Sequence, residues 1–538
     1  MTEFNLADLF ESVVDAIPDS EALVAGEERL TYRQLDEGAN RLAHVLAQRG
    51  IGPGDHVGLY MYNSRQHVEA FLAAFKLRAV PINVNYRYVA DELAYLFGDS
   101  DLAALIADRE FCPVLSALGD ALDGIGTVLV VDDDSGESCE GLGALDYDTE
   151  VDAASPERDF APRSADDHYI LYTGGTTGMP KGVVWRHEDI FFAALSGGRP
   201  GGDPVSTPEE LAAEYVPGDS LSMLVLPPLM HGAAQWSTLI GLFMGQRLVL
   251  NTQRRFEAEA MWRLVETESV FSLGIVGDAM GRPLIEAFEA MDPRPDVSSL
   301  FTVASGGAIW SDAVKARYRE LLPNAMLVDA YGSSETGSQG VGLTADSGDE
   351  EGLPRFHMSE DHTVLDENLQ PVEPGSGNRG HVARSGHIPL GYYGDEVKTA
   401  KTFVEVDGRR WVLQGDEATI EADGSITMFG RGSVCINTGG EKVFPEEVEA
   451  ALKTHDAVFD AIVVGVPDDK WGEVVVGVVQ PREGATPDAE EVIAAARTKV
   501  AGYKAPREIV LVDELVRSPA GKPDYKAARS VAVDRLGG

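Results

Sequence analysis

Basic residues are scarce in this chain of 538 residues, which has 44 lysines and arginines against 88 aspartates and glutamates, a formal net charge of −44. A surface of this charge repels nucleic acids and anionic membranes, so we expect neither as a main partner. A solvated acidic surface accounts for the charge without any bearing on the fold. If the ligands are anions, a few local cations and a metal ion must outweigh the overall field.

Cysteines and long apolar runs are also scarce. Cys112, Cys139 and Cys435 lie far apart and form no C-x-x-C motif, so we expect no disulfide framework and no zinc site, but reduced thiols in a cytoplasmic protein. The N-terminus lacks the basic segment of a signal peptide. The most apolar stretch, 221–250, is broken by prolines and charged or polar residues, which argues against integral membrane association. The sequence does not decide the oligomeric state, and a homodimer is one possibility.

Short apolar runs alternate with segments of helical period through the first 330 residues. A capping box, Thr31–Gln34, opens a helix that ends at Gly50, and further helices are expected at 63–77 and 312–322. The predicted strands are 57–60, 79–84, 104–106, 127–131, 169–172, 221–226, 247–250, 272–276, 302–305 and 326–329. This alternation predicts an α/β fold with largely parallel sheets, which bind ligands at the carboxyl ends of their strands.

The length and the later pattern predict more than one domain. A chain of this size exceeds one ordinary core. The acid-rich segment 132–159 is expected to be a surface excursion without further role. After Gly340, shorter strands with frequent turn residues predict a β-rich subdomain. Helix–strand alternation returns from Glu446, which indicates a small α+β domain of about 100 residues.

The densest chemical motif is Tyr172-Thr-Gly-Gly-Thr-Thr-Gly-Met-Pro-Lys-Gly182, directly after a predicted strand. Glycines let backbone N–H groups approach an anion, hydroxyl groups add donors, and a lysine adds charge, a set that suits a polyphosphate. The contributing residues are Thr173, Gly174, Gly175, Thr176, Thr177, Gly178 and Lys181. It is not a Walker A loop, because the lysine is followed by glycine and not by serine or threonine.

Two other patterns are rejected as catalytic motifs. Gly375–Gly380 satisfies G-x-G-x-x-G, but it follows a proline and no amphipathic helix comes after it, so we do not expect a dinucleotide site. His231 could suggest a catalytic base, and a histidine of the core or of a gate is the preferred interpretation.

The glycine-rich segment resembles the phosphate loop of the AMP-forming acyl-CoA synthetases, a superfamily shared with peptide-synthetase adenylation domains and firefly luciferase. Further segments resemble the family's other motifs in the same order. They are Ser305–Ala308, Asp329–Gly337, Gln414–Asp416, Gly430–Arg431, Gly439–Glu449 and Ser518–Lys522. Together they span nearly the whole chain.

The resemblance implies binding of ATP or AMP, Mg²⁺ and coenzyme A. It implies that Tyr331 stacks on adenine, Ser334 touches phosphate, Glu335 holds Mg²⁺ and contributes to catalysis, and Asp416 binds ribose. Other residues implied to bind nucleotide are Gly306, Gly307, Ala308, Asp329, Gly332, Ser333, Arg431 and Lys442. The residues implied for the acyl and coenzyme A channel are His231, Gly232, Gly439 and Gly440.

Lys522 is implied to be the catalytic lysine. A carboxylate that attacks the α-phosphate of ATP is an anion meeting an anion, and a lysine between them cancels charge and aligns the reactants. The resemblance implies an N-terminal domain, 1–430, a hinge, 431–434, and a mobile C-terminal domain, 435–538, that swings between two half-reactions. Ser433 is atypical as a hinge residue.

The function expected is an ATP-dependent acid–CoA ligase acting on a small-molecule hydrophobic acid. Segments such as Trp185–Ile190, Met230–Gln235 and Gly277–Pro283 resemble an actinobacterial branch of ligases for fatty acids and sterol side-chain acids. The sequence leaves three classes of acid open as the substrate: a sterol side-chain acid, a medium- or long-chain fatty acid, and an aryl acid. Two alternatives are an acyl-AMP ligase that loads a carrier protein and a non-catalytic nucleotide sensor.

Overall fold

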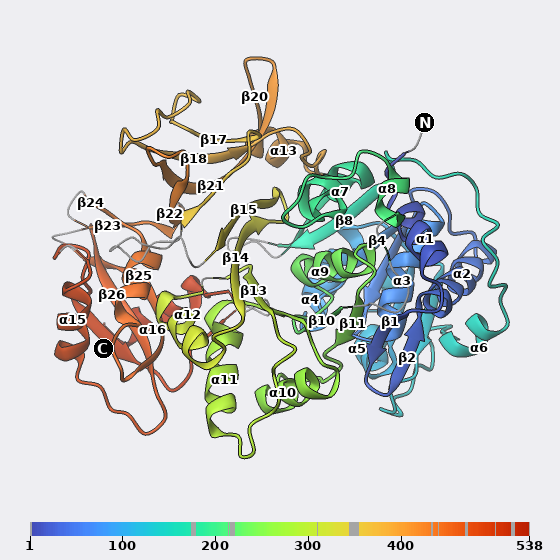
Figure 1. Cartoon of the computed structure of the whole chain (residues 1–538), viewed down its shortest axis with the longest axis horizontal. Helices are drawn as coiled ribbons and strands as arrows, with labels where there is room; N and C mark the ends of the chain where they lie inside the picture. The colour runs from blue at the N-terminus through green and yellow to red at the C-terminus, as the bar shows by residue number, and fades with distance from the viewer. Residues whose placement is uncertain are drawn as a thin grey trace.

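The computed structural model contains a large α/β domain and a small α+β domain (Figure 1). It describes residues 3–173, 179–213, 215, 221–308, 310–343, 355–431, 434–438, 441–468, 472–500, 502–517 and 522–536. We call β23–β27 with α14–α16 the small domain and everything before them the large domain. The predicted fold class is confirmed.

Two eight-stranded sheets form the large domain. Sheet A has the order β15-β14-β13-β12-β10-β11-β1-β2, and sheet B has the order β19-β9-β8-β4-β3-β5-β6-β7. The strands of sheet A are β1 Glu21–Ala25, β2 Glu28–Thr31, β10 Ser222–Val225, β11 Arg247–Leu250, β12 Ser272–Ile275, β13 Thr302–Gly306, β14 Met326–Ser333 and β15 Gly337–Leu343. Those of sheet B are β3 His56–Tyr60, β4 Val80–Asn83, β5 Leu102–Asp108, β6 Thr127–Val131, β7 Leu145–Asp146, β8 His168–Thr173, β9 Lys181–Arg186 and β19 Gly391–Tyr392.

Most strand pairs are parallel, as the sequence predicts, but each sheet also carries an antiparallel hairpin. Among the antiparallel pairs are the hairpins β1–β2 and β14–β15 in sheet A and β8–β9 in sheet B, and the last two matter here. β14 runs beyond the predicted 326–329 because its last residues pair with β15, from Ala330 opposite Val341 to Ser333 opposite Gly337. The β14–β15 and β8–β9 hairpins matter for function, since both carry predicted nucleotide-binding residues.

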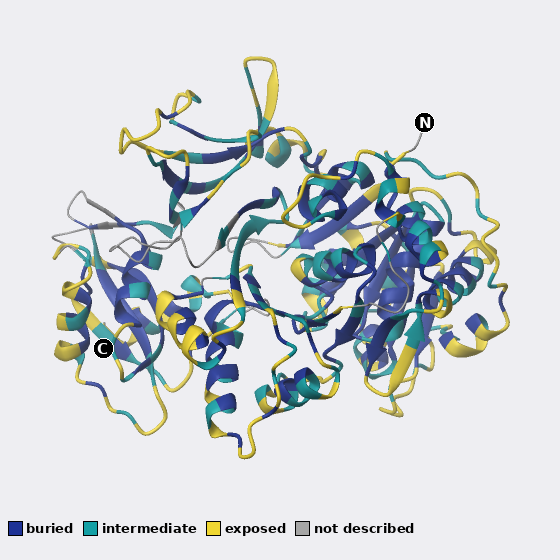
Figure 2. Cartoon of the chain, in the orientation of Figure 1, coloured by how far each residue is buried: buried dark blue, intermediate teal, exposed yellow. Residues whose placement is uncertain are grey.

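Helices cover both faces of each sheet. One buried cluster lies between sheets A and B and includes α1, α2, α3, α7 and α9; a second packs α10–α12 on the other face of sheet A, and a third packs α4 and α5 on the other face of sheet B. Figure 2 shows the buried strands inside and the exposed outer helix faces. The helices are α1 Leu6–Ala16, α2 Tyr32–Gln48, α3 Arg65–Lys76, α4 Ala90–Asp99, α5 Cys112–Ala117, α6 Tyr147–Asp152, α7 His187–Ala194, α8 Pro208–Ala212, α9 Gly232–Phe243, α10 Ala258–Thr267, α11 Gly277–Ala290, α12 Asp312–Leu321 and α13 Glu396–Thr402.

Local sequence signals explain several helix boundaries. The predicted capping box at Thr31 and Gln34 is present at the start of α2. α3 begins at Arg65 and not at residue 63, because the Ser64 hydroxyl accepts a hydrogen bond from the His67 amide and caps the helix there.

The β-rich subdomain and the small domain follow. The subdomain has the order β16-β22-β21-β18-β17 with β20 beside β21, and the small-domain sheet has the order β24-β23-β26-β25 with β27 beside β26. The subdomain strands are β16 Arg355–Phe356, β17 His362–Leu365, β18 Arg379–Arg384, β20 Phe403–Val406, β21 Arg409–Ile420 and β22 Ile426–Arg431. The small domain comprises β23 Ile436–Thr438, β24 Glu441–Val443, α14 Pro445–Leu452, β25 Val458–Asp468, β26 Gly472–Pro481, α15 Ala489–Arg497, β27 Glu508–Leu511 and α16 Tyr525–Leu536. The segment 375–380 leads into β18 and not into a helix.

The expectation of reduced, distant cysteines is wrong for one pair. Cys112 and Cys139 form a disulfide with Cα atoms 5.0 Å apart. The chain after β6 folds back over α5, where Arg109 pairs with Asp132 at 3.0 Å. Spacing along the sequence could not reveal this proximity, because a tertiary fold-back creates it.

The acid-rich excursion is also more ordered than expected. It contains β7 and α6, and Tyr147 at the start of α6 is fully buried. The Tyr147 hydroxyl donates to Glu69 at 2.8 Å, which anchors the excursion to α3. Among the residues that the structure describes, no helix combines the length and the apolar composition needed to cross a membrane.

Candidate active site

Two hairpins meet at the predicted nucleotide site. In the β8–β9 hairpin, Thr173 and Lys181 are opposite each other in register and form the two ends of the glycine-rich loop. The predicted phosphate-binding residues Gly174, Gly175, Thr176, Thr177 and Gly178 lie outside the described residues. The Trp185 indole N–H of β9 donates to the Ser334 carbonyl at 2.9 Å. The phosphate-loop hairpin is therefore fixed against the β14–β15 turn.

Residues predicted to bind the nucleoside come together from distant segments. The Tyr331 hydroxyl, on β14, donates to Asp416 Oδ2, on β21, at 2.7 Å. Arg431 lies opposite Asp416 in the β21–β22 register. Gly306, Gly307 and Ala308 follow from β13, the neighbour of β14. An aromatic ring and a carboxylate are thus in direct contact, and the glycine-rich end of β13 lies on the strand next to β14.

Glu335 is held at both carboxylate oxygens by uncharged donors. The Tyr392 hydroxyl donates to Oε1 at 2.9 Å, and the Gln414 side-chain amide donates to Oε2 at 2.6 Å. These donors fix the position of the carboxylate. Because neither donor is charged, they do not neutralise its negative charge. A single carboxylate next to phosphate suits Mg²⁺, which takes most of its ligands from phosphate and water. The residues present therefore fit that ion.

The turn before and after Glu335 depends on close backbone contacts. Ser333 and Thr336 bond each other through their hydroxyls at 2.8 Å. A side chain at Gly332 would come within 2.2 Å of the Gly337 carbonyl, and Gly337 itself has a φ of +67°. The Arg384 guanidinium donates hydrogen bonds to the carbonyls of Thr336 and Ser338 and so stabilises the turn. Glycine is required at both positions by geometry.

Lys181 is engaged by acidic neighbours. Its Nζ lies 3.5 Å from Asp99 and 3.7 Å from Asp395, and 5.7 Å from the ring centre of Tyr95. Hydrogen bonding to Tyr95 and attraction by the two carboxylates raise the pKa of Lys181 above its ordinary value. The lysine is thus charged, and an incoming polyphosphate must compete with two carboxylates for it.

Asp329 faces a lysine of the large domain. Lys315 Nζ lies 3.2 Å from Asp329 Oδ2. Burial raises the pKa of Asp329, and the lysine opposes this shift. The Asp329 carboxylate is consequently committed to a structural ion pair in this structure.

The predicted acyl-channel residues lie at the start of α9. His231 is the residue before α9, and Gly232 is its first residue. A side chain at Gly232 would come within 2.3 Å of Leu171 Cδ2, so this glycine permits close packing of α9 on sheet B. Asn83 donates to the carbonyls of Tyr172 and Met230 at 2.8 and 2.7 Å. It thereby links the phosphate-loop hairpin to the segment with His231.

The small-domain residues are placed less completely. Lys522 is exposed and lies between Arg517 and Pro523, which form an isolated β-bridge. The Lys442 backbone pairs with Asn437 in the β23–β24 hairpin. Gly439, Gly440 and Ser433 lie outside the described residues.

Sequence reasoning missed Tyr392, Gln414, Trp185 and Arg384. Gln414 is the first residue of the predicted motif Gln414–Asp416 but was given no role of its own, and Tyr392 lies in a Gly-Tyr-Tyr segment outside the predicted motifs. Neither position showed which side chain would turn toward Glu335, because that depends on how β19 and β21 approach the β14–β15 turn.

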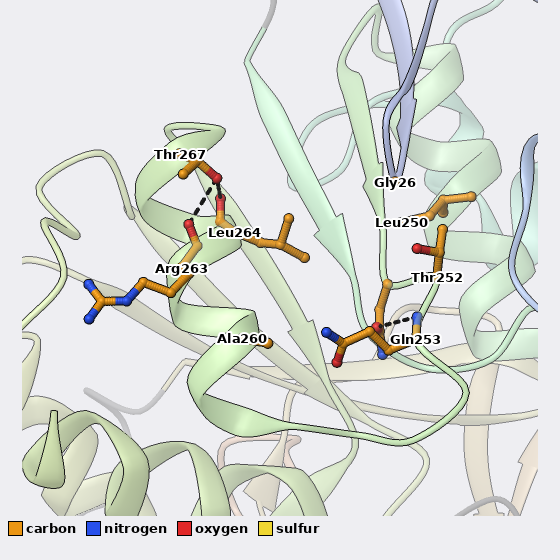
Figure 3. A pocket seen from close by; sticks show the side chains of 9 residues that line it. Gly26, Leu250, Thr252, Gln253, Ala260, Arg263, Leu264 and Thr267 are labelled. Atoms are coloured by element: carbon orange, nitrogen blue, oxygen red, sulfur yellow. Dashed lines mark hydrogen bonds between the residues drawn. The ribbon is translucent and has the colours of Figure 1, made fainter.

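One hollow among the described residues lies away from this site. It has a volume of about 380 Å³ and lies at the ends of β1 and β11 beside α10. Figure 3 shows Arg263 pointing away from Gly26 and Thr252, so no charged group of the labelled set faces the hollow. We assign it no part in the chemistry.

Comparisons with known proteins agree with this geometry. The sequence model of the AMP-binding enzyme family matches residues 10–393, and that of the AMP-binding enzyme C-terminal domain matches residues 447–522. The chain is 47% identical over 531 residues to a 3-oxocholest-4-en-26-oate–CoA ligase of Rhodococcus rhodochrous, covering 98% of this chain and 95% of that protein.

One further relative and one solved structure are similar along nearly the whole chain. A medium/long-chain-fatty-acid–CoA/3-oxocholest-4-en-26-oate–CoA ligase of Mycolicibacterium smegmatis is 47% identical over 536 residues, covering 99% of this chain and 97% of that protein. The structure of an anthranilate CoA ligase in complex with anthranoyl-AMP superposes with a TM-score of 0.85 at 22% identity, covering 100% of this chain and 99% of that one, which shows the shared fold. On the evidence of these matches, the chain belongs to the family of AMP-binding enzymes.

Proposed function

We propose that this enzyme joins a hydrophobic carboxylic acid to coenzyme A and converts ATP to AMP and pyrophosphate. The observation that carries the proposal is the β14–β15 turn, where Tyr331 bonds Asp416 and Glu335 is fixed at both oxygens. The residues proposed to bind the nucleoside and the metal ion therefore belong to one segment of the chain. The CoA ligase activity of the two 47% identical relatives supports the choice of acceptor.

In the first half-reaction, a carboxylate oxygen of the acid attacks the α-phosphorus of ATP. The bond from that phosphorus to the bridging oxygen breaks, and pyrophosphate leaves. We assign Lys181 to the leaving pyrophosphate and Lys522 to the space between the acid and the α-phosphate, because both reactants are anions. Mg²⁺ held by Glu335 would supply charge neutralisation at the phosphates, while Tyr392 and Gln414 keep the Glu335 carboxylate in place.

In the second half-reaction, the thiol sulfur of coenzyme A attacks the acyl carbonyl carbon. The bond to the AMP oxygen breaks, AMP leaves, and the thiol proton passes to solvent. We propose that the domain after residue 435 turns about 431–434 relative to 1–430, so that Lys522 leaves and 439–440 line the thiol path. Glycine there would let backbone approach a narrow pantetheine chain.

The substrate class follows from the relatives. The names of both 47% identical ligases include a sterol side-chain acid, and the name of one also includes medium- and long-chain fatty acids. We propose the same two classes for this enzyme. We also propose a cytoplasmic location. Thiols are normally kept reduced in the cytoplasm, so the Cys112–Cys139 bridge counts against this location. The redox state of these two cysteines in the native protein therefore tests it.

Mass spectrometry tests the reaction directly. The enzyme is mixed with ATP, Mg²⁺ and coenzyme A, together with a sterol side-chain acid, a straight-chain fatty acid or an aryl acid. We expect acyl-CoA and AMP with one of the first two. An acyl-AMP that coenzyme A cannot discharge would favour loading of a carrier protein, and absence of AMP with every acid would favour a nucleotide sensor.

Lys522→Ala tests the division of labour between the half-reactions. We expect acid-dependent pyrophosphate exchange to fall about 100-fold, while transfer from a supplied acyl adenylate to coenzyme A is retained. Lys526→Ala is the matched control, since Lys526 is an exposed lysine of the same domain, on α16. Equal loss in both half-reactions would contradict the assignment of Lys522.

A further inference from the structure

A buried ion pair joins the two domains. Lys453 follows α14 of the small domain, and its Nζ lies 3.4 Å from Asp278 Oδ2, in the first turn of α11 of the large domain. The lysine and aspartate side chains are only 4% and 3% exposed. Charged side chains are almost never this buried unless they are paired, and a buried pair adds little stability for its desolvation cost. The pair therefore calls for a reason other than general stability.

Asp278 is tied to the nucleotide region independently of Lys453. It accepts a hydrogen bond from the Ser311 amide at 2.8 Å, and Arg282 lies 3.3 Å away on the same helix. The neighbouring Gly277 amide donates to the Ser305 hydroxyl at 2.9 Å. Ser305 and Ser311 lie on either side of the predicted nucleotide-binding residues 306–308. A contact made by Asp278 is thus transmitted to the backbone beside the nucleotide.

Both charges keep a partner if the domains separate. Glu449, one turn earlier on α14, interacts electrostatically with Lys453 and accepts a hydrogen bond from the Val463 amide at 2.9 Å. On the other side, Asp278 keeps Arg282. When the contact between the domains breaks, neither charge is therefore left without a charged neighbour, and this lowers the free-energy cost of separating the domains. Such a contact can form and release repeatedly.

The observed orientation is consistent with one of the two half-reactions. Figure 1 shows β23 and β24 on the outer side of the small domain, away from β14 and β15. At the domain junction, Arg379 lies 3.9 Å from the ring centre of Phe429 and 5.0 Å from that of Phe444. With β23 and β24 on that side of the small domain, we assign this orientation to the half-reaction that does not need them at the nucleotide site.

We propose that Lys453 and Asp278 are positioning residues that hold the small domain in the orientation for acyl-adenylate formation and separate before thioester formation. The inference rests on the proposed two-step function. Neither residue touches substrate. The pair acts by setting how often the small domain occupies the orientation that adenylates the acid.

Lys453→Met tests the pair, because methionine keeps much of the volume and removes the charge. We expect pyrophosphate exchange to fall about tenfold and transfer from a supplied acyl adenylate to coenzyme A to stay equal or rise. Lys453→Arg should restore part of the exchange rate. Asp278→Asn on the Lys453→Met background should add little further loss, since the contact is already absent.

Arg482→Gln is the matched control. Arg482 also crosses the interface, to Glu286 at 3.0 Å, but both side chains are more than 40% exposed, and exposed pairs contribute little. We expect it to leave both half-reactions unchanged. Loss in both half-reactions with Lys453→Met, loss in thioester formation alone, or an equal effect of Arg482→Gln would each overturn the proposal.

A measurement of domain orientation separates this proposal from the proposed function. Spin labels at the exposed positions Glu27 and Glu490 report the distance between the domains. Lys453→Met should broaden or shift the distance distribution, and Arg482→Gln should not. If the wild-type protein makes no AMP with any acid, the proposed function fails, whereas an unchanged distribution in Lys453→Met refutes the positioning role alone.

Discussion

Lys76 and Lys453 are both buried lysines paired with carboxylates, but they join different kinds of elements. Lys76 has no exposed side-chain surface, lies 2.7 Å from Asp36 and also pairs with Glu11. These three residues tie α3 to α2 and α1 inside the large domain. Lys453 instead contacts Asp278 across the domain interface at the longer distance of 3.4 Å.

The difference lies in what happens when the pair breaks. The helices around Lys76 share one packed core, so its partners cannot become hydrated unless that core opens. The partners of Lys453 belong to two separate cores, and each retains another charged neighbour after separation. Similar chemistry thus gives a permanent structural contact in one place and a reversible contact in the other.

Lys76→Met should have the largest effect on stability. We expect a loss of about 3 kcal/mol in the free energy of unfolding of the large domain, because carboxylates that cannot leave the core lose a partner. Urea denaturation followed by tryptophan fluorescence measures it. Lys453→Met in the same experiment should cost less than Lys76→Met, because Asp278 keeps Arg282 as a charged neighbour when the lysine is lost. Equal costs would remove the distinction between the two lysines.

Glu449→Gln should have a smaller effect that depends on pH. Burial raises the pKa of Glu449 to about 7 from 4.5, while Lys453 opposes the shift. Between these values the folded state keeps a proton that the unfolded state has released, so the wild-type small domain loses stability as pH rises. The penalty is complete above about pH 7, where glutamine should stabilise by up to about 3 kcal/mol.

Thermal unfolding at about pH 4.5 and about pH 8 measures this difference. The variant and the wild type should be alike at the lower pH and differ at the higher one. A stabilisation of the same size at both would show that the carboxylate's charge is not its cause.

Added salt should have the smallest effect. A net charge of −44 produces self-repulsion, and about 1 M NaCl screens it, so we expect the melting temperature to rise by a few degrees. The buried Lys453–Asp278 contact is screened much less than exposed charges. The distance between labels on the two domains should therefore stay the same as salt increases. If salt instead increases the distance between the labels, the Lys453–Asp278 contact is exposed to solvent and not buried as described.

Much of the site was predictable where recognition is local. Tyr331, Glu335 and Lys181 stand in segments whose glycines and hydroxyl residues already indicate phosphate chemistry, and 127–131 and 247–250 match their observed strands. The donors to Glu335 were not predictable, because they arrive from β19 and β21. The Cys112–Cys139 pairing was missed for a similar reason, since a fold-back of the chain creates it.

The sequence by itself determined the α/β alternation, the order of the motifs and the cap that starts α2, because each depends on residues close together in the chain. Only the tertiary structure decided that Tyr392 and Gln414 hold Glu335 and that Lys453 reaches Asp278. Those contacts join residues that are distant along the chain. Their geometry is set by how sheets and domains pack, which no local pattern encodes.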